Sequence, residues 1–536
     1  MRTKFQLMAA LTAMLLGAVA CSQQGGSTGA APSAAGSPQR GGQLTVLKDT
    51  SFDGSWPTGL DPATNTTGGA NIAQMSAIYG GLFQLTANND GTGAKVEPYQ
   101  AESYQILDGG KTLKIKLRAG LKFTDGTPLD AEAVRSNIQR DMDSPCSCRP
   151  IWVLAKKDPI TTEGDDTVVL RFAVPTASAV NNFPISNVNW VASPAALKQM
   201  GKDKFRVTPV GAGPFKVVSN RLSSELVLQR NPGYFKPGLP YLDRLTFKSI
   251  GGDQAAYQTL LAGQADAFEG MTTTPLLEQA TKNAKLTVTS QPPTSPYVVQ
   301  LNTAIAPFNN EKARQAIYAA TDFNAIARGV FKNKYPVSQS FIAPGGLFYH
   351  PGGVPGYRGY NLAEAKRLVQ EVGGITIKLG TIADFVARQV NIALQTQWRQ
   401  AGINVTIEDY QLNRLVEAFN GHKWQAMLQT AGAWDPATGV GVAFRFASTS
   451  PFTGVKDPKL DQMLNQAAAS VDSAQRDKLY TEAGKYISDH SFAPFGLAFA
   501  PANLAVKGVF GPGLTTKIPP LVVNSGILWD QVWKAK

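Results

Sequence analysis

The residue types that most often carry chemistry are few in this chain of 536 residues. The three histidines, His350, His422 and His490, lie far apart, and no carboxylate stands beside them at a metal-binding spacing. Cys146 and Cys148 lie together in SPCSCRP, but a metal site needs more ligands, and no histidine is near in sequence. We therefore expect no metal site and no cofactor. The cysteine pair is predicted to form a small strained disulfide or to stay as two loop thiols.

Catalytic motifs are also missing. The chain has no SxxK or HExxH sequence. GGKT at 109–112 has Gln105 where a P-loop requires glycine, and GAG at 211–213 has Lys216 where a dinucleotide fingerprint requires its third glycine. We expect no catalytic residues, and this absence favours a binding protein over an enzyme. A secreted hydrolase remains the alternative from another class.

The amino-terminal residues have the pattern of a secretory leader. Arg2 and Lys4 precede an apolar run from Leu7 to Ala20, which is too short to span a bilayer comfortably. Cys21 ends the run, and residues 22–40 contain no aromatic residue and no Leu, Ile or Val. Such a composition cannot offset its chain entropy by burial, so it predicts a flexible tether.

This beginning resembles a bacterial lipoprotein signal, which implies that Cys21 is lipidated. The resemblance has one departure, because Ala18 stands where the usual motif has leucine. A signal peptide cut near the same point without lipidation and an uncleaved membrane anchor are the alternatives. We predict a signal peptide at 1–20, a tether at 21–40, and a protein that is either anchored to the cell membrane or periplasmic.

The remaining chain is long and basic. About 500 residues exceed one ordinary domain, so two or three lobes are expected. Removing the two basic residues of the leader from the formal net charge of +12 leaves +10, which suits an anionic surface or ligand. There is no dense cluster of Lys and Arg, so we expect no nucleic-acid partner. No second apolar run reaches 18 residues.

Strands and helices alternate along this part. TLKIKL at 112–117 alternates apolar and basic residues, which predicts a half-buried strand, and Asp130 is a predicted N-cap for the following helix. Asn361, with Glu364 three residues later, predicts a second capped helix, followed by a strand at 375–379. The other predicted elements are strands at 168–172, 226–230, 244–250 and 403–407, a helix with an apolar stripe at Ala313, Ala316, Ile317 and Ala320, and a further helix that ends near Ala401. This alternation indicates an α/β fold.

Several stretches in order resemble the extracellular solute-binding proteins of ATP-driven importers for dipeptides and oligopeptides, bacterial solute-binding protein family 5. The resemblance extends over roughly residues 43–500. The stretches that carry it are LDPAT at 60–64, YGGLFQL at 79–85, KTLKIKLRAGLKFTDGTPLDAEAV at 111–134, VGAGPFKVVS at 210–219, RNPGYFKPGLPYLDRLTF at 230–247, LLAGQADAF at 260–268, LNTAIAPFNNEKARQAIYAATD at 301–322 and YNLAEAKRLVQEVGG at 360–374.

The resemblance implies an α/β, two-lobed periplasmic-binding-protein-like fold with an additional subdomain in the first lobe. On this view the first lobe comprises 41–70, 206–300 and 497–536. The additional subdomain comprises 71–205, and the second lobe comprises 301–496. Solute sites of such proteins lie between the lobes, which close around the ligand.

The resemblance also suggests ligand contacts. In peptide-binding relatives, a tryptophan-containing stretch of the second lobe carries an aspartate that meets the ligand's ammonium group. Here QTAGAWDPATGVG at 429–441 matches that stretch, although Trp434 and Asp435 stand closer together than the pattern has them. Core packing and a simple turn are the alternatives for these two. The predicted ligand contacts are Trp434, Asp435, Thr50, Ser51, Trp56, Phe268 and Tyr297. Core packing is also the alternative for the aromatic residues Trp56, Phe268 and Tyr297.

The family resemblance makes peptides the first class of solute, because main-chain hydrogen bonds tolerate many side chains. Nickel chelates, oligosaccharides and opine-like compounds are the alternatives within the same role. The expected partners are the solute, the ABC permease subunits with their ATPases, and a membrane through the lipid anchor. We expect a monomer. A sensing lipoprotein remains an alternative to import.

Overall fold

The computed structural model describes residues 36–49, 56–65, 71–88, 93–144, 152–382, 385–410, 414, 417–419, 421, 423–430, 434–439, 441–450, 452–518 and 526–536. The predicted features Cys21, Thr50, Ser51, Cys146 and Cys148 lie outside these residues. The chain divides into Met1–Ser37 and Pro38–Lys536, and all helices and strands given below belong to the second unit. Among the described residues, no helix is both long and apolar enough to cross a membrane.

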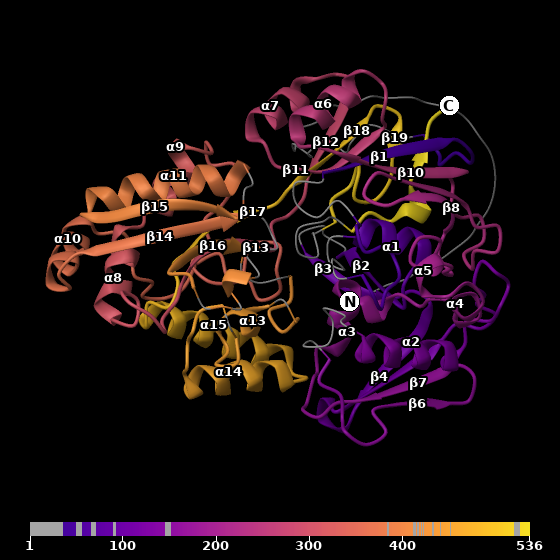
Figure 1. Ribbon diagram of the computed structural model, residues 1–536, viewed down its shortest axis with the longest axis horizontal. Helices are drawn as coiled ribbons and strands as arrows, with labels where there is room; N and C mark the ends of the chain where they lie inside the picture. The colour runs from indigo at the N-terminus through magenta and orange to yellow at the C-terminus, as the bar shows by residue number, and fades with distance from the viewer. Residues whose placement is uncertain are drawn as a thin grey trace, which may run out of the picture. The chain divides into compact units, whose positions relative to one another are not determined.

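A seven-stranded sheet forms the first lobe, with the strand order β12-β18-β11-β1-β10-β9-β8. Its centre is parallel, because β1 pairs in the same direction with both β10 and β11. The strands are β1 Gln43–Asp49, β8 Phe215–Arg221, β9 Glu225–Arg230, β10 Arg244–Ile250, β11 Ala267–Met271, β12 Leu286–Ser290 and β18 Ala502–Val506. The helices that pack on it are α1 Ile72–Tyr79, α6 Asp253–Leu261 and α7 Thr274–Lys282 (Figure 1).

A five-stranded sheet forms the second lobe, with the strand order β15-β14-β16-β13-β17. Its strands are β13 Ser295–Leu301, β14 Ile375–Ile382, β15 Ile403–Tyr410, β16 Ala426–Thr430 and β17 Phe495–Phe499. Its helices are α8 Glu311–Ala320, α9 Phe323–Gly329, α10 Leu362–Glu371, α11 Phe385–Gln400, α13 Val442–Phe446, α14 Pro458–Ala469 and α15 Ser473–Asp489. In Figure 1, α11 runs along β14 and β15, while α13, α14 and α15 lie on the other side of the sheet.

Two connections join these sheets within the described residues. The chain crosses from β12 to β13 through residues 291–294 and returns from β17 to β18 through residues 500–501. The backbone N–H of Gln291 donates to the carbonyl of Pro501 at 3.5 Å, so the two connections run side by side. Paired connections of this kind suit a hinge, because only a few residues must change their backbone angles. Strand β13 belongs to the second sheet from Ser295, so the crossing precedes the predicted lobe boundary at 301; the other predicted boundaries stay predictions.

A four-stranded sheet, in the order β4-β5-β7-β6, forms the core of a further subdomain. Its strands are β4 Ala101–Leu107, β5 Thr112–Leu117, β6 Ile160–Glu163 and β7 Thr167–Arg171. Its helices are α2 Ala131–Asp143, α3 Ala179–Asn182, α4 Pro194–Met200 and α5 Lys202–Phe205. Two strand pairs complete the fold, β2 Phe83–Ala87 with β3 Ala94–Pro98, and β19 Val509–Phe510 with β20 Trp533–Lys534.

The predicted local signals are confirmed. In β5, Leu113, Ile115 and Leu117 are buried, as the alternation predicts. The Asp130 side chain accepts a hydrogen bond from the backbone N–H of Ala133 and caps α2. Asn361 caps α10 in the same way through the N–H of Glu364. Each such cap satisfies an N–H that the helix itself leaves unpaired.

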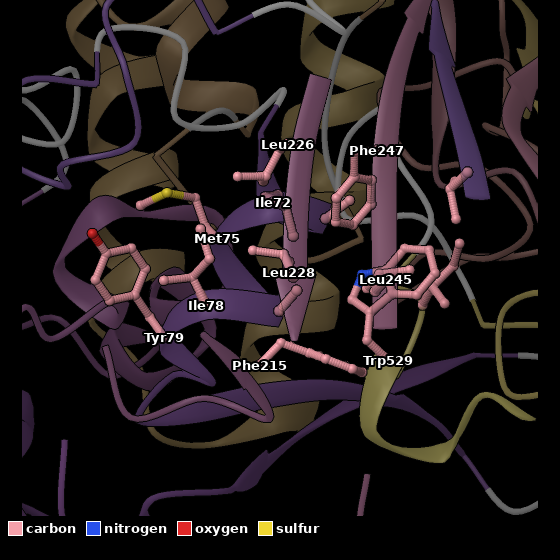
Figure 2. Packing of buried hydrophobic residues seen from close by; sticks show 14 of the residues in the cluster. Ile72, Met75, Ile78, Tyr79, Phe215, Leu226, Leu228, Leu245, Phe247 and Trp529 are labelled. Carbon is pink, nitrogen blue, oxygen red and sulfur yellow. The ribbon is translucent and has the colours of Figure 1, made fainter. Parts of the chain in front are cut away.

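A large hydrophobic cluster lies between α1 and the first sheet. Figure 2 shows Ile78 of α1 facing Leu228 of β9, with Phe247 and Trp529 meeting farther along the sheet. The rings of Phe247 and Trp529 pack edge to face, with centroids 5.2 Å apart. Full burial of side chains of this size is worth about 1.5–3 kcal/mol each. This packing fixes the carboxyl-terminal segment, which carries Trp529, to the first lobe.

Candidate functional site

The loop 434–439 follows β16 and holds a carboxylate buried among hydrogen-bond donors. The Oδ1 atom of Asp435 accepts hydrogen bonds from Arg476 Nη2 at 2.7 Å and from the backbone N–H of Ala437 at 2.9 Å. The side chain of Asp435 has no exposed surface, and that of Arg476, on α15, is 11% exposed. Burial opposes the charge on Arg476, but the carboxylate outweighs it, so the pKa of this guanidinium is raised above its usual value.

The same loop contacts the subdomain. Asn181 Nδ2 donates to Asp435 Oδ2 at 2.6 Å, and the backbone N–H of Gly439 donates to Asn182 Oδ1 at 2.8 Å. A third contact joins the backbone N–H of Ala177 to the carbonyl of Ala468 at 3.2 Å. These three hydrogen bonds connect the short helix α3, and Ala177 two residues before it, to the second lobe. The subdomain and the second lobe are therefore in direct contact at this loop.

Trp434 packs across the same junction. Although it follows a strand of the second sheet, it belongs to the hydrophobic cluster of the first lobe that Figure 2 displays in part. Its ring is buried, and its indole Nε1 has no hydrogen-bond partner among the described residues. A buried indole N–H without a partner is uncommon and costs free energy. Trp434 therefore presents an unused donor close to the contact between the lobes.

The first lobe contains a buried ion pair. Lys48 of β1 and Glu269 of β11 are register partners on parallel strands, with Nζ and Oε2 2.5 Å apart. Both side chains are nearly inaccessible to solvent. The pair lies near the carboxyl ends of these strands, the edge at which open α/β sheets bind ligands.

The aromatic residues predicted as contacts occupy the cores of their lobes. Trp56 is fully buried in the first-lobe cluster, and its indole donates to Asn220 Oδ1 at 2.8 Å. Phe268 is buried between the first sheet and α6 and α7. Tyr297, the register partner of Thr430, stacks on Phe499 with centroids 5.8 Å apart. Core packing was the alternative for these residues, and their contact with a solute stays a prediction.

Only some of the predicted ligand contacts lie close together in the structure. Trp434 and Asp435 lie at the junction between the second lobe and the subdomain, whereas Thr50 and Ser51 fall outside the described residues. Sequence reasoning missed Asn181 and Arg476, which hold the Asp435 carboxylate, because no local pattern links residues so far apart.

The two sheets, the paired connections and the buried contacts between the parts define a two-lobed binding protein. The model of the family described as bacterial extracellular solute-binding proteins, family 5 Middle, matches residues 95–451. The chain belongs to this family. Members are solute-binding components of ABC importers and not enzymes, so the expected class of protein is confirmed. Such components work outside the cytoplasm with permease and ATPase subunits.

Similar proteins agree with this assignment. The glutathione-binding protein GsiB of Escherichia coli K12 is 29% identical over 459 residues, which cover 82% of this chain and 86% of that protein. Among solved structures, AgaA of A. tumefaciens R10 in complex with agropinic acid has a TM-score of 0.76 at 20% identity and covers 92% of this chain and 99% of its own. DppA of Helicobacter pylori with the peptide STSA has the same TM-score and identity and covers 93% and 99%. The predicted two-lobed α/β fold is thus confirmed.

Proposed function

We propose that this protein captures peptides between its two lobes and delivers them to an ABC permease. The observation that carries the proposal is the Asn181–Asp435 hydrogen bond, by which the subdomain and the second lobe meet over the stretch 429–441. That stretch is the one to which the family resemblance assigns ligand contacts. A closed contact there suits a protein that buries its solute between lobes.

The compounds that similar proteins bind favour a peptide as the solute of this protein. GsiB is a glutathione-binding protein, and the H. pylori structure contains a peptide. Glutathione is itself a tripeptide with a free ammonium group and two carboxylates. Opine-like solutes are the second candidate, because AgaA was solved with agropinic acid. Nickel chelates and oligosaccharides have no such support here.

Two ligand contacts are part of the proposal. Trp434 lies beside the solute, and Asp435 acts on its cationic group. Three donors already reach the Asp435 carboxylate, which has about four acceptor positions, so one position on Oδ2 remains. Opening of the lobes releases the bond from Asn181 and frees a second position. A solute ammonium then competes with Asn181 for this oxygen.

Calorimetry of the mature chain tests the proposal. We expect saturable binding of glutathione, tri-alanine or Met-Leu, and mass spectrometry of the purified protein should find peptides bound to it. If a sugar or a metal chelate co-purifies and none of these peptides gives a heat of binding, that compound would replace peptides as the proposed solute. Turnover of a peptide in the same assay would overthrow the transport role.

The anchor and the oligomeric state complete the proposal. Cys21 carries lipid, and residues 22–40 link the lobes to the membrane. Two or more acyl chains give stable attachment, whereas a single chain holds only weakly. The protein acts as a monomer, which sedimentation of the chain without its lipid can check.

A further inference from the structure

One edge of the first sheet carries exposed basic side chains. Strands β1, β10, β11 and β12 all begin at this edge, and β18 ends there, because β18 pairs in the opposite direction with both β11 and β12. The edge lies opposite the carboxyl ends of the parallel strands, at which open α/β sheets bind ligands. The basic residues that begin, directly precede or directly follow these strands are all exposed: Arg244, Lys285 and Lys507.

Both ends of the unit Pro38–Lys536 join the same edge. The Gln39 side chain accepts a hydrogen bond from the backbone N–H of Lys536 at 2.9 Å. The N–H of Ala535 donates to the carbonyl of Gly508 at 2.7 Å, and the carboxyl terminus lies beside β19 in Figure 1. The two ends therefore add further cations to this surface, which we call the basic edge and which comprises Arg40, Arg244, Lys285, Lys507, Lys534 and Lys536.

Few acidic groups balance the basic edge. Asp266 pairs with Lys534 at 2.7 Å, whereas Asp243 pairs at 2.8 Å with Arg230, which is not part of the edge. The terminal carboxylate of Lys536 adds one more negative charge. Within the described ranges, no ion pair includes the remaining residues of the edge. Positive charge is thus in excess here, and such a surface attracts an anionic partner.

The chain that precedes this unit limits what the basic edge can reach. Residues 22–38 are rich in Gly, Ser and Ala and contain no charged residue. A coil of this length and composition has a root-mean-square end-to-end distance of about 20–25 Å. With lipid on Cys21, as proposed above, that distance keeps the basic edge close to the headgroups of a bilayer. The partner that the tether brings to this surface is therefore the membrane itself.

We propose that the basic edge is a docking surface for an anionic lipid bilayer. The role of this surface in the cell rests on the proposed anchor at Cys21, but its charge belongs to the folded unit. Attraction of basic side chains to anionic headgroups falls off within a Debye length, so docking requires the edge to face the lipid. The attraction is reversible and orients a tethered protein without replacing its lipid. The carboxyl ends of the strands and the connections to the second lobe then lie on the side away from the bilayer.

Vesicle binding of unlipidated protein tests the surface apart from the anchor. The probe is the mature chain with Cys21→Ala, mixed with vesicles of phosphatidylcholine alone or of phosphatidylcholine and phosphatidylglycerol in equal parts, and bound protein is measured by flotation. We expect binding to the mixed vesicles only. It should be lost between about 0.1 and 1 M salt, because the screening length falls from about 10 to 3 Å.

Removal of charge from the basic edge should weaken this binding. Lys285→Gln combined with Lys507→Gln should lower the affinity for mixed vesicles about thirtyfold, since each basic residue at an anionic surface contributes about fivefold. Lys366→Gln combined with Arg399→Gln is the matched control, because it removes the same charge from exposed residues around a surface hollow of the second lobe. This control should bind like the unsubstituted chain. Equal losses in both double variants would show attraction by net charge alone and overturn the docking surface.

Failure of the anchor has a different signature. If vesicle binding depends on Lys285 and Lys507 while wild-type protein from cells carries no lipid on Cys21, the docking surface is supported and the proposed anchor is wrong. If Cys21 carries lipid but the unlipidated chain does not bind the mixed vesicles at low salt, the anchor is supported and the docking surface is overturned. Neither result depends on the solute that the lobes bind.

Discussion

The amide of Asn181 donates to the carboxylate of Asp435 across 2.6 Å, although 254 positions separate the two residues in the chain. Asn181 belongs to the subdomain and Asp435 to the second lobe. The other oxygen of the same carboxylate accepts a hydrogen bond from Arg476, which belongs to the second lobe. The side chain of Asp435 thus forms hydrogen bonds both within its own lobe and to the subdomain. We therefore expect that a substitution at this carboxylate changes the equilibrium between open and closed lobes.

Asn181→Ala should shift the protein toward its open form. The substitution removes a charge-assisted hydrogen bond, worth about 1.5–3 kcal/mol when both groups are shielded from water. Small-angle scattering without ligand should give a larger radius of gyration for the variant than for the wild type. Saturating solute should restore the wild-type value, because the ligand favours the closed state.

Asn404→Ala is a suitable control for this experiment, since Asn404 is an exposed residue of β15 whose side chain makes a long contact of 3.4 Å to Thr376. The radius of gyration of Asn404→Ala should match that of the wild type. If the Asn181 variant also scatters like the wild type, the contact has no influence on closure.

Asp435→Asn should reduce both stability and affinity. The variant leaves Arg476 without its acid in a buried setting, and breaking one side of a buried ion pair costs about 3–5 kcal/mol. Loss of a contact with a cationic solute group adds roughly a thirtyfold loss of affinity or more. Melting temperature and calorimetric affinity, measured on the same preparation, separate the two effects.

Asp409→Asn serves as the comparison, because its exposed pair with Arg388 contributes only about 0–1 kcal/mol. A lower melting temperature for Asp435→Asn with unchanged affinity would assign Asp435 to structure alone. The ligand contact would then be sought elsewhere, first in the segment that follows β1.

Asp141 should make the protein less stable as the pH rises. This residue of α2 is fully buried, and neither carboxyl oxygen has a partner among the described residues. Burial raises the pKa of Asp141 well above its usual value, the Arg140 cation opposes this shift, and the Asp61 carboxylate adds to it. The folded state therefore retains a proton that the unfolded chain loses near pH 4, and stability falls from that pH toward the raised pKa.

Asp141→Asn should accordingly raise the melting temperature at pH 7, and the gain should vanish near pH 4. Asp143→Asn, two residues later on the exposed side of the same helix, should show no such trend. If the difference in melting temperature between Asp141→Asn and the wild type is the same at all pH values, Asp141 does not retain a proton in the folded state.

Cys21→Ala should release the protein from membranes. The leader and tether predict that lipid on this cysteine is the attachment, and several acyl chains are needed for stable binding. Fractionation of cells should move the variant to the extracytoplasmic soluble fraction, while Ser22→Ala stays with the membrane. An unlipidated wild-type mature terminus at another residue, found by mass spectrometry, would remove the basis of this prediction.

Local patterns in the sequence determined much of the fold. The alternation in TLKIKL, the caps at Asp130 and Asn361, and the apolar stripe of α8 all depend on neighbours within a few residues, and each formed as predicted. The order of the motifs predicted the family, because several separate stretches each resembled the same family in the same order. The family resemblance also pointed to Trp434 and Asp435 as ligand contacts, which stay a prediction.

Tertiary structure alone decided how these residues are used. Trp434 follows a strand of the second lobe yet packs in the cluster of the first, and Trp56 forms part of the same core. Asp435 is held by Asn181 and Arg476, neither of which has any sequence relation to it. Hydrogen bonds and ion pairs depend on distance in space, and a sequence fixes that distance only along its own local elements.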